Sequence, residues 1–384
     1  MSYEKIRFGD LYAIDSRNGL SKPSKIRGSG YKMINMGELF ANNRIYDIPM
    51  ELVPLKDSEK INAKVEAGDL LFARQSLVLE GAGKCSIVMA VSPLTVFESH
   101  LIRVRLVENA NPMFYYYYFS SPLSPVKTIV SQCAQAGIRG SDLQELEVLF
   151  PPKEVQDKIA ATLSAYDDLI ENNQKQIKLL EEAARRLYKE WFVDLRFPGY
   201  EDIDVVDGVP EGWSINLIDD VVGKVTRSKQ IKTADYLSEG SIPVIDQSRD
   251  FIAGYTNDAE ALVNMDCPVI VFGDHTRILK YIQFPFAKGA DGTQLIVSIN
   301  ENMPQSLLYC SLIAVDLSNY HYARHFKYLK VEPILVPTKE IADKFDCIVS
   351  PILQKTQKLR DVSYKAAKAR DRLLPKLMSG ELEM

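Results

Sequence analysis

Apolar residues recur at alternating steps of four and three along two long stretches of the chain. The first stretch runs roughly from Pro152 to Phe192, and Asn173 interrupts its apolar stripe at one core position. This spacing is typical of a coiled-coil helix. The apolar positions are Val155, Ile159, Leu163, Tyr166, Ile170, Ile177, Leu180, Ala184, Leu187 and Trp191.

Charged residues fill the positions between these apolar residues. We interpret them as a solvated outer face that keeps the helix soluble. Examples are Asp167, Asp168, Glu171, Glu181, Lys175, Lys178 and Arg185.

The second stretch runs roughly from Thr338 to Met378 with similar steps. Because proline lacks an amide hydrogen, Pro351 predicts a kink near Ser350, and Pro375 predicts fraying after Leu374. A helix of about 40 residues is a rod about 60 Å long, so two such helices could pair and hold two bodies apart. The apolar positions are Ile341, Phe345, Ile348, Ile352, Leu359, Val362, Ala366, Ala369, Leu373 and Leu377.

Each stretch opens with a copy of one segment. Residues 149–159 read LFPPKEVQDKI and residues 335–345 read LVPTKEIADKF, with six of eleven positions identical. A repeat at this distance is too long for a solenoid unit and has the size of a domain plus a helix. The chain therefore consists of two similar halves, and a pseudo-two-fold relation between them predicts antiparallel helices.

The segments before the two helices alternate short β-rich runs with turns rich in Gly, Pro, Asn and Ser. We predict an α+β fold with two similar α/β domains and a coiled-coil spacer of two long antiparallel helices. The expected boundaries are 1–150 for the first domain, 151–196 for the first helix, 197–336 for a linker and the second domain, and 337–384 for the second helix. The β-rich runs are Tyr31–Asn35, Gly68–Ala73, Leu101–Val107, Ile242–Asp246, Pro268–Phe272 and Leu295–Ile299.

Composition places the chain among soluble multidomain proteins. It has 384 residues, of which 46% are hydrophobic and 25% charged, and a net charge of −5, so a nucleic-acid partner can be argued only from local charge. No signal core or membrane span is apparent, so we expect a cytoplasmic protein. Five scattered cysteines without CxxC spacing are expected to be reduced, buried residues rather than disulfides or zinc ligands.

Two basic loops without acidic residues lie at equivalent places in the two halves. An offset of 210 aligns Arg17 with Arg227 and Lys22 with Lys232. Such loops suit contacts with phosphates or base edges, although they could also be ordinary solvated loops. The first loop carries Arg17, Lys22, Lys25, Arg27 and Lys32, and the second carries Lys224, Arg227, Lys229 and Lys232.

Later loops add weaker candidates for DNA contact. Arginine and lysine suit guanine edges and phosphates, but the sequence assigns none of them to a base. They are Arg74, Lys84 and Arg139 in the first domain, and His275, Arg277, Lys280, Lys288, Arg324 and Lys327 in the second.

Several motifs suggest chemistry but fail on spacing. GAGKCS at Gly81–Ser86 lacks the first glycine and the Ser or Thr of a phosphate loop. His321 and His325 lack a third metal ligand, so packing or DNA contact is favoured. FYYYYFSS at Phe114–Ser121 could stack on bases, but a core helix is favoured. Without catalytic or cofactor motifs, we expect no catalysis, metal or cofactor in this chain.

The whole chain resembles the specificity subunits of type I restriction-modification enzymes. The resemblance rests on the doubled segments PPKEVQDKIA and PTKEIADKFD, on WFVDLRFPG at 191–199, on PEGW at 210–213 and on LLPKLMSGELE at 373–383. The chain departs from internal symmetry at Pro351, which has no counterpart at Ala165, and its second domain is shorter than its first.

The resemblance implies that each domain reads one half of a bipartite DNA target. The helices would set the gap and dock two modification subunits. S-adenosylmethionine, ATP and Mg would then act on the partner modification and restriction subunits, not on this chain. The alternatives are a coiled-coil scaffold without a DNA role, or an enzyme, which the absence of catalytic motifs disfavours.

Overall fold

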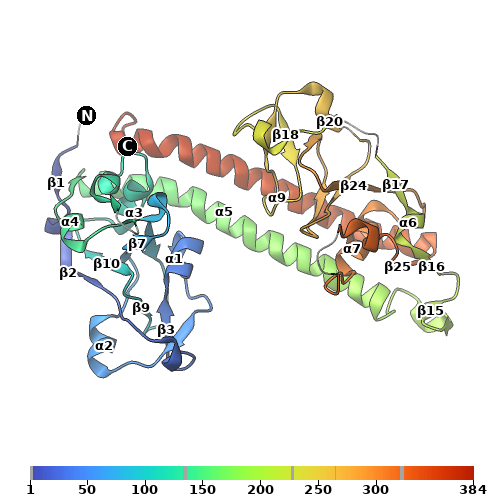
Figure 1. The fold of residues 1–384 in the computed structure, drawn as a ribbon, viewed down its shortest axis with the longest axis horizontal. Coiled ribbons are helices and arrows are strands. Elements are labelled where there is room, and N and C mark those ends of the chain that lie inside the picture. The colour runs from blue at the N-terminus through green and yellow to red at the C-terminus, as the bar shows by residue number, and fades with distance from the viewer. Residues whose placement is uncertain (1–2, 133–135, 226–228, 264, 321–323) are drawn as a thin grey trace. The chain divides into compact units, whose positions relative to one another are not determined.

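The computed structural model describes residues 3–132, 136–225, 229–263, 265–320 and 324–384 (Figure 1). The chain divides into two compact units. The first unit comprises Met1–Glu171 with Tyr364–Met384, and the second comprises Asn172–Ser363. Each unit thus includes part of both long helices. The domain boundaries expected at residues 150, 196 and 336 stay a prediction.

The first unit is built on a five-stranded sheet with strand order β2-β10-β6-β8-β4 and on smaller sheets. Its predicted strands at 31–35, 68–73 and 101–107 are confirmed as β3, β6 and β10. The large sheet contains β2 (Tyr12–Asn18), β10 (Leu101–Leu106), β6 (Leu70–Ala73), β8 (Cys85–Val88) and β4 (Arg44–Ile45). A two-stranded sheet pairs β1 (Lys5–Arg7) with β13 (Glu147–Leu149). In a three-stranded sheet, β3 (Tyr31–Ile34) lies between β5 (Glu51–Val53) and β9 (Val96–Phe97). In another, β12 (Ala136–Gly137) lies between β11 (Ser131–Gln132) and β7 (Gln75–Ser76).

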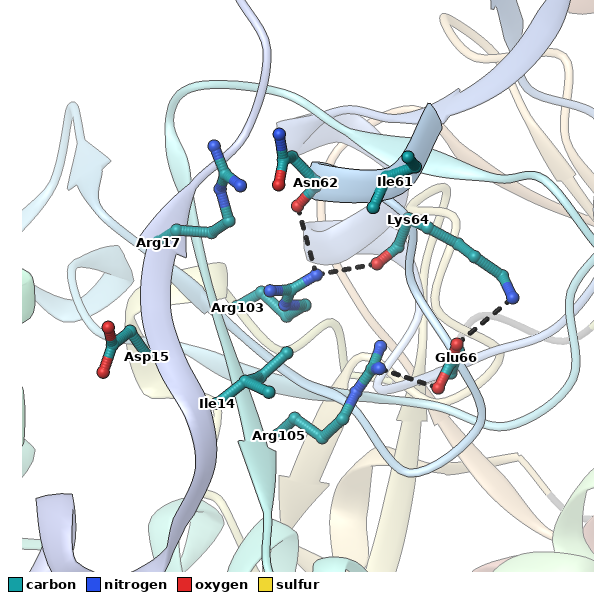
Figure 2. Close-up of a pocket in the computed structure, with 9 residues that line it drawn as sticks. All are labelled: Ile14, Asp15, Arg17, Ile61, Asn62, Lys64, Glu66, Arg103 and Arg105. Carbon is teal, nitrogen blue, oxygen red and sulfur yellow. Dashed lines mark hydrogen bonds and ion pairs between the residues drawn. The ribbon is translucent and has the colours of Figure 1, made fainter. Parts of the chain in front are cut away.

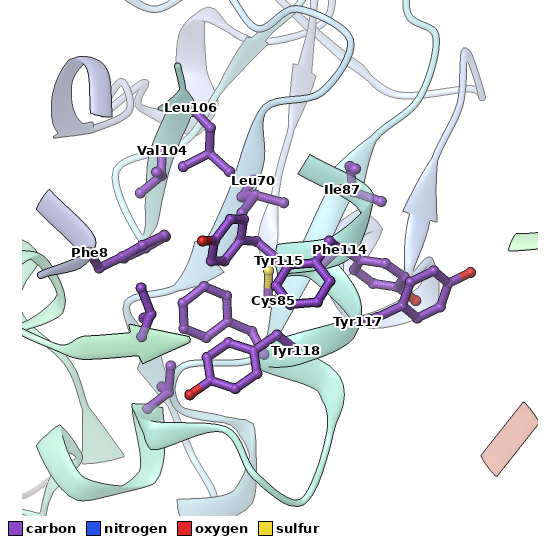
Figure 3. Packing of buried hydrophobic residues seen from close by; sticks show 14 of the residues in the cluster. Phe8, Leu70, Cys85, Ile87, Val104, Leu106, Phe114, Tyr115, Tyr117 and Tyr118 are labelled. Atoms are coloured by element: carbon purple, nitrogen blue, oxygen red, sulfur yellow. The ribbon is translucent and has the colours of Figure 1, made fainter. Parts of the chain in front are cut away.

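The aromatic run forms the centre of the first unit's core. Helix α3 (Pro112–Ser120) begins at Asn111, whose side chain accepts hydrogen bonds from the amides of Met113 and Phe114. All six aromatic residues from Phe114 to Phe119 are buried against the large sheet (Figure 3). The prediction of a core helix is therefore confirmed. Stacking of these rings on bases would require exposed rings and is excluded by their burial.

The second unit repeats this plan with fewer strands. Its predicted strands at 242–246, 268–272 and 295–299 are confirmed as β18, β21 and β24. One sheet orders β17 (Val222–Lys224), β24 (Thr293–Ser298), β21 (Val269–Gly273) and β22 (Leu279–Ile282), and another orders β19 (Gly254–Thr256), β18 (Ile242–Ile245), β23 (Phe286–Lys288) and β20 (Leu262–Val263). Two-stranded sheets pair β16 (Ser214–Leu217) with β25 (Pro333–Val336) and β14 (Val205–Val206) with β15 (Val209–Pro210).

Strand pairing repeats the same topology in the two units. In the first unit, β1 pairs antiparallel with β13, the strand just before the first long helix. In the second unit, β16 pairs antiparallel with β25, the strand just before the second long helix. The order β2-β10-β6-β8 matches β17-β24-β21-β22, and β3 and β18 each have one antiparallel and one parallel neighbour. The internal repeat predicted from the sequence is therefore confirmed as a repeat of fold.

Short helices connect the strands. In the first unit these are α1 (Met36–Ala41), α2 (Asp57–Asn62) and α4 (Gly140–Gln144). In the second unit they are α6 (Ile218–Val221), α7 (Gln305–Ala314) and α8 (Phe326–Leu329). Helix α7 follows β24 as α3 follows β10, and both helices are apolar on all sides and lie in the core of their units.

The doubled segment begins the two long helices, α5 (Lys153–Tyr188) and α9 (Lys339–Ser379). Its identical residues build the same ion pair in both helices: Lys153 with Asp157 at 2.6 Å, and Lys339 with Asp343 at 2.9 Å. Pairs four residues apart stabilise a helical turn by a few tenths of a kcal/mol, about 0.2–0.5. The Lys and Asp that both copies of the segment share are therefore explained by an ion pair that stabilises the first turns of each helix.

The two long helices pack against each other in each unit, in antiparallel directions. In the first unit, Ile159 and Leu163 of α5 share a core with Leu374 and Leu377 of α9. In the second unit, the ring centroids of Trp191 and Phe345 are 5.7 Å apart. The residue numbers of the contacts on α9 decrease as those on the first helix increase, as expected for the predicted antiparallel pairing.

The expected fraying of the second helix is wrong. Helix α9 is assigned without a break from Lys339 to Ser379, through both Pro351 and Pro375. Beyond Leu374, Leu377 is 1% exposed and Met378 is fully buried in the core of the first unit. Tertiary packing of these side chains outweighs the local cost of proline near the helix end.

The WFVDLRFPG and PEGW motifs supply one aromatic cluster in the second unit. A single π-helical turn, Lys189–Val193, ends α5 and carries two of its rings. Phe192 lies against Phe345 of α9 with centroids 5.1 Å apart, and Phe197 lies 4.7 Å from Trp213. These motifs therefore fix the chain's exit from α5 onto the second unit.

Candidate nucleic-acid interface

The first basic loop presents two free cations on the first unit. Arg17 lies on β2 and Lys25 on a short 3-10 turn (Ser24–Ile26); both are exposed, and neither makes an ion pair with a described residue. Arg27 instead pairs with Glu51 at 2.6 Å, and Lys32 pairs with Asp47 at 2.7 Å. Exposed cations of this kind can contact phosphates, whereas paired ones must first leave their carboxylates.

Lys22 does not present a free ammonium group, contrary to the interpretation of its loop. Its side chain is 8% exposed and its ammonium lies 2.7 Å from Glu59 of α2. This ion pair holds the pKa of the Glu59 carboxyl below its usual range, together with the amide of Lys56, which donates to the same carboxylate. The pair fastens the loop to α2, so Lys22 acts in packing.

The later candidates of the first unit fall into two environments. Arg139 is exposed next to β12, where the amide of Ile138 donates to the carbonyl of Arg74 at 2.9 Å, so these two arginines lie on neighbouring segments. Lys84 donates instead to the carbonyl of Phe40 at 2.8 Å, and partial burial lowers the pKa of its ammonium. Arg74 and Arg139 remain candidates for DNA contact, while Lys84 is engaged within the fold.

A mixed polar and apolar surface adjoins these arginines. His100 and Gln75 share a hydrogen bond of 2.9 Å, and both line a shallow pocket with Phe40 and Leu77. Leu77 is 90% exposed. Amide and imidazole groups beside an exposed apolar side chain can contact base edges and thymine methyl groups.

The second basic loop is described only in part. Arg227 lies outside the described residues. Lys229 is exposed but pairs with Asp258 at 2.7 Å, which raises the pKa of its ammonium. Lys232, just before a 3-10 turn (Thr233–Asp235), is exposed and has no ion pair with a described residue.

The remaining candidates of the second unit divide between surface and core. Lys280 is 4% exposed, and desolvation lowers the pKa of its ammonium to about 8. The prediction that Lys280 contacts DNA is therefore wrong, because its ammonium group is buried. Arg277 has a left-handed backbone (φ 60°) and donates to the carbonyl of Leu317 at 2.9 Å. His275, Arg324 and Lys327 are exposed, and Lys288 lies half-buried on β23.

Two arginines that the sequence analysis missed lie beside Arg17. Arg103 and Arg105 alternate with apolar residues on β10, and Arg103 is directly opposite Arg17 on β2. With Ile14 and Lys64 they line a pocket of about 420 Å³ (Figure 2). The period-two pattern of LIRVRL, with both arginines on the same face of the strand, is the signal that could have identified them.

The acidic residues of α5 are not simply a solvated face. Asp167 is 6% exposed and accepts hydrogen bonds from Tyr117 of α3 and Arg370 of α9. Asp168 lies 2.7 Å from Arg44 of β4, and Glu181 accepts from Arg360 of α9. The solvation interpretation is therefore wrong for Asp167, which is buried. Asp168, whose side chain is 62% exposed, and Glu181 stay in contact with solvent while they also pair with arginines.

The histidine pair and the cysteines noted in the sequence lie partly in the core and partly on the surface. His325 is buried, with its ring nitrogens 2.9 and 3.0 Å from the carbonyls of Asp274 and Tyr320; His321 lies outside the described residues. Cys85 and Cys310 are buried, as expected, but Cys267 and Cys347 are exposed, which corrects the expectation for these two. Cys133 lies outside the described residues.

The described residues contain neither a metal-binding cluster nor a membrane-spanning helix. Among the described residues, no group of three or more His, Cys, Asp or Glu side chains could hold a metal ion. Within the same residues, no helix is long and apolar enough to cross a membrane.

Comparison with known proteins identifies the class of this fold. Residues 2–182 match the family described as "Type I restriction modification DNA specificity domain". The type I restriction enzyme MjaIX specificity subunit of Methanocaldococcus jannaschii is 28% identical over 326 residues, which cover 78% of this chain and 75% of that protein. The EcoKI specificity subunit of Escherichia coli is 29% identical over 176 residues, or 44% of this chain and 38% of that protein.

A solved structure agrees in fold along the chain. The type I restriction-modification S subunit of M. genitalium superposes with a TM-score of 0.64 at 17% identity, over 98% of this chain and 96% of that one. Residues 2–182 thus match a type I DNA specificity domain, and most of the chain is similar in sequence to type I specificity subunits. These similarities support the DNA-recognition interpretation and not that of a scaffold without a DNA role.

Proposed function

We propose that this chain is the DNA sequence-specificity subunit of a type I restriction-modification system. The observation that carries the proposal is the repetition of one domain topology, each copy leading into a long helix that begins with the same ion pair. A protein with two copies of one reader suits a target in two parts. The first unit would read one half of the target and the second unit the other.

Differences between the two readers support a target with two different halves. The framework strands correspond, but the cations do not: Arg103 and Arg105 on β10 have no counterpart on β24, whose sequence is TQLIVS. Base edges are read by side chains that vary in type, whereas a framework only positions them. The two halves of the DNA target would therefore differ in sequence.

The paired helices would serve as spacer and as the dock for two modification subunits. Several apolar side chains on α5 and α9 face solvent instead of the helix seam, including Leu179 (65% exposed), Ile348 (45%) and Val362 (43%). Exposed apolar side chains on otherwise polar helices suit a protein partner. These residues are the ones we assign to that interface.

In this proposal the chain performs recognition and not catalysis. Adenine methylation with S-adenosylmethionine would occur on the modification subunits, and ATP and Mg would act on the restriction subunits. Methylome sequencing of cells that express this chain with its modification subunit tests the proposal directly. A bipartite methylated motif with a fixed gap is expected; methylation without such a motif, or methyl transfer by the chain alone, would contradict it.

A further inference from the structure

The pocket between β2 and β10 concentrates positive charge on one face of the sheet. Residues directly opposite in an antiparallel pair point to the same face, and so do residues two apart on one strand. Arg103 is opposite Arg17, and Arg105 is two residues beyond Arg103. Like charges placed opposite each other destabilise a sheet, so folding alone does not account for this arrangement.

The two carboxylates nearest to Arg105 are already paired. Arg105 makes a bidentate contact with Asp69 at 2.7 and 2.8 Å and also pairs with Glu66 at 2.7 Å. Lys64 lies 3.1 Å from the same Glu66. Asp15 lies at the edge of the pocket, and its carboxylate points away from Arg103 in Figure 2. These carboxylates therefore leave two guanidinium groups, those of Arg17 and Arg103, without an anionic partner among the described residues.

Arg103 is the less usual of the two guanidinium groups. It is 4% exposed, and its guanidinium donates to the backbone carbonyls of Lys64 at 2.8 Å and Asn62 at 3.4 Å (Figure 2). The same group lies over the ring of Phe97, 5.7 Å from its centroid. Its Nε–H is buried without a hydrogen-bond partner among the described residues. Burial lowers the pKa of this group, although Asp69 partly offsets the effect. A buried guanidinium group that no carboxylate neutralises adds positive potential to the pocket in front of it, which favours an anion there.

The shape of the pocket discriminates between two parts of a DNA duplex. Base edges lie inside the grooves, so a side chain that reads them must project from the protein. Phosphate groups project from the duplex, so a pocket with the exposed guanidinium of Arg17 at its mouth and that of Arg103 within it is complementary to a phosphate. We propose that this pocket, here called the arginine pocket, binds a phosphodiester group of the DNA backbone beside the half-site of the first unit, which rests on the function proposed above.

The proposed contact would set the register of the first unit on DNA. A rigid contact with one phosphate fixes how far each loop reaches along the groove, without itself selecting a base. The second unit has Leu295 of β24 opposite Val271, where the first unit has Arg103 opposite Leu71. The arginine pocket therefore belongs to one half-site only.

The test uses the chain in complex with its modification subunits and duplexes that contain the cognate site. Each duplex carries one neutral methylphosphonate in place of one phosphate, moved along the site. Arg17→Ala removes the exposed cation of the arginine pocket, Arg17→Lys retains a charge, and Lys5→Ala removes an exposed cation on β1 outside the pocket. Thermal unfolding of each variant identifies any that fold poorly.

The expected result is a coupling between one phosphate and Arg17. The wild-type complex loses affinity at one methylphosphonate position beside the first half-site, and Arg17→Ala loses no further affinity there. The slope of log affinity against log salt falls by about 0.9 for Arg17→Ala, as for one lost phosphate contact. Arg17→Lys retains part of the coupling, and Lys5→Ala behaves as wild type.

Three results would overturn the arginine pocket as a phosphodiester site. One is a loss for Arg17→Ala that depends on a single base pair, because Arg17 would then read a base edge. Another is equal sensitivity of wild type and Arg17→Ala at every methylphosphonate position. The third is binding of inorganic phosphate in a calorimetric titration, lost in Arg17→Ala, without any coupling on DNA. Failure of the wild-type complex to bind any duplex would instead reject the proposed function itself.

Discussion

The hydroxyl group of Tyr117 on α3 donates a hydrogen bond of 2.6 Å to the buried carboxylate of Asp167 on α5. Arg370 of α9 donates to the other oxygen of the same carboxylate. One acidic side chain thus joins the core helix of the first unit to both long helices. The hydrogen bond also helps burial to raise the pKa of the Tyr117 phenol.

Replacing Asp167 should therefore destabilise the first unit. Asp167→Asn removes the charge that balances Arg370 and weakens the bond to Tyr117, and we expect a loss of about 2–3 kcal/mol in the free energy of unfolding. Denaturant titration followed by tyrosine fluorescence or circular dichroism measures the loss. Glu154→Gln, at an exposed ion pair on the same helix, is the matched control and should cost less than about 0.5 kcal/mol. Equal losses in the two variants would show that the buried carboxylate has no special role.

Lys22 and Lys25 of the first basic loop should separate stability from DNA binding. Lys22→Ala breaks a buried pair with Glu59 and should lower the stability of the first unit by about 1–3 kcal/mol. Lys25→Ala removes an exposed cation and should leave stability within about 0.5 kcal/mol. In the complex with modification subunits, the salt slope of DNA binding should fall for Lys25→Ala only. A lower slope for well-folded Lys22→Ala would restore Lys22 as a DNA contact.

Lys280 should make the second unit more stable in mildly alkaline solution. Desolvation lowers the pKa of its ammonium to about 8 in the folded chain, against 10.5 for an ordinary lysine. Between these values the unfolded chain binds more protons, so the free energy of unfolding rises with pH. The full effect is at most roughly 3 kcal/mol, at 1.36 kcal/mol per pKa unit.

Unfolding titrations of Lys280→Met and wild type from pH 7 to about 10.5 check this window. The variant should lack the rise, and its DNA affinity in the complex should keep the wild-type salt slope, because a buried lysine releases no counterion. Lys330→Met, at an exposed pair with Asp219, is the control that should retain the rise. A wild-type stability that falls steadily across this window would argue against a depressed pKa.

Lengthening both long helices by one heptad should change the spacing of the target. Seven residues add about 10.5 Å of helix, which equals about three base-pair steps of 3.4 Å. Insertions after Glu171 in α5 and after Ser363 in α9, where the two compact units meet in sequence, keep the heptad register of both helices. Methylome sequencing should report a gap that differs by about three base pairs. An unchanged gap would mean that the helices do not measure it.

Leu179 should contribute to binding of the modification subunit. Its side chain is 65% exposed on α5, so Leu179→Ser costs the isolated chain little stability. We expect the affinity for the modification subunit to fall about tenfold, as for an interface residue worth about 1.4 kcal/mol. Ile61→Ser, at an 80% exposed residue on α2 of the first unit, is the control and should bind as wild type. If both variants assemble normally, the apolar residues of this helix do not form the dock.

Much of the fold could be predicted because it depends on local periodicity. The heptad spacing identified α5 and α9 to within a few residues, and alternating apolar runs identified β3, β6, β10, β18, β21 and β24. The repeat of PxKE predicted two halves, which the strand pairing confirms. The end of α9 was missed because Leu377 and Met378 are held by the core of the first unit, which no local pattern around Pro375 reports.

The candidate interface was predicted less well, since a cation's role depends on its neighbours in space. The residue pattern is enough to identify the loops that lack acidic residues, and with them the lysines and arginines that are candidates for DNA contact. The burial of Lys22 and Lys280, the bonds of Asp167 to two other helices, and the pairing of Arg17 with Arg103 across two strands distant in sequence follow only from the folded chain. The reason is physical: residue type and spacing set helix and strand formation, whereas charge availability is set by contacts between residues far apart in the chain.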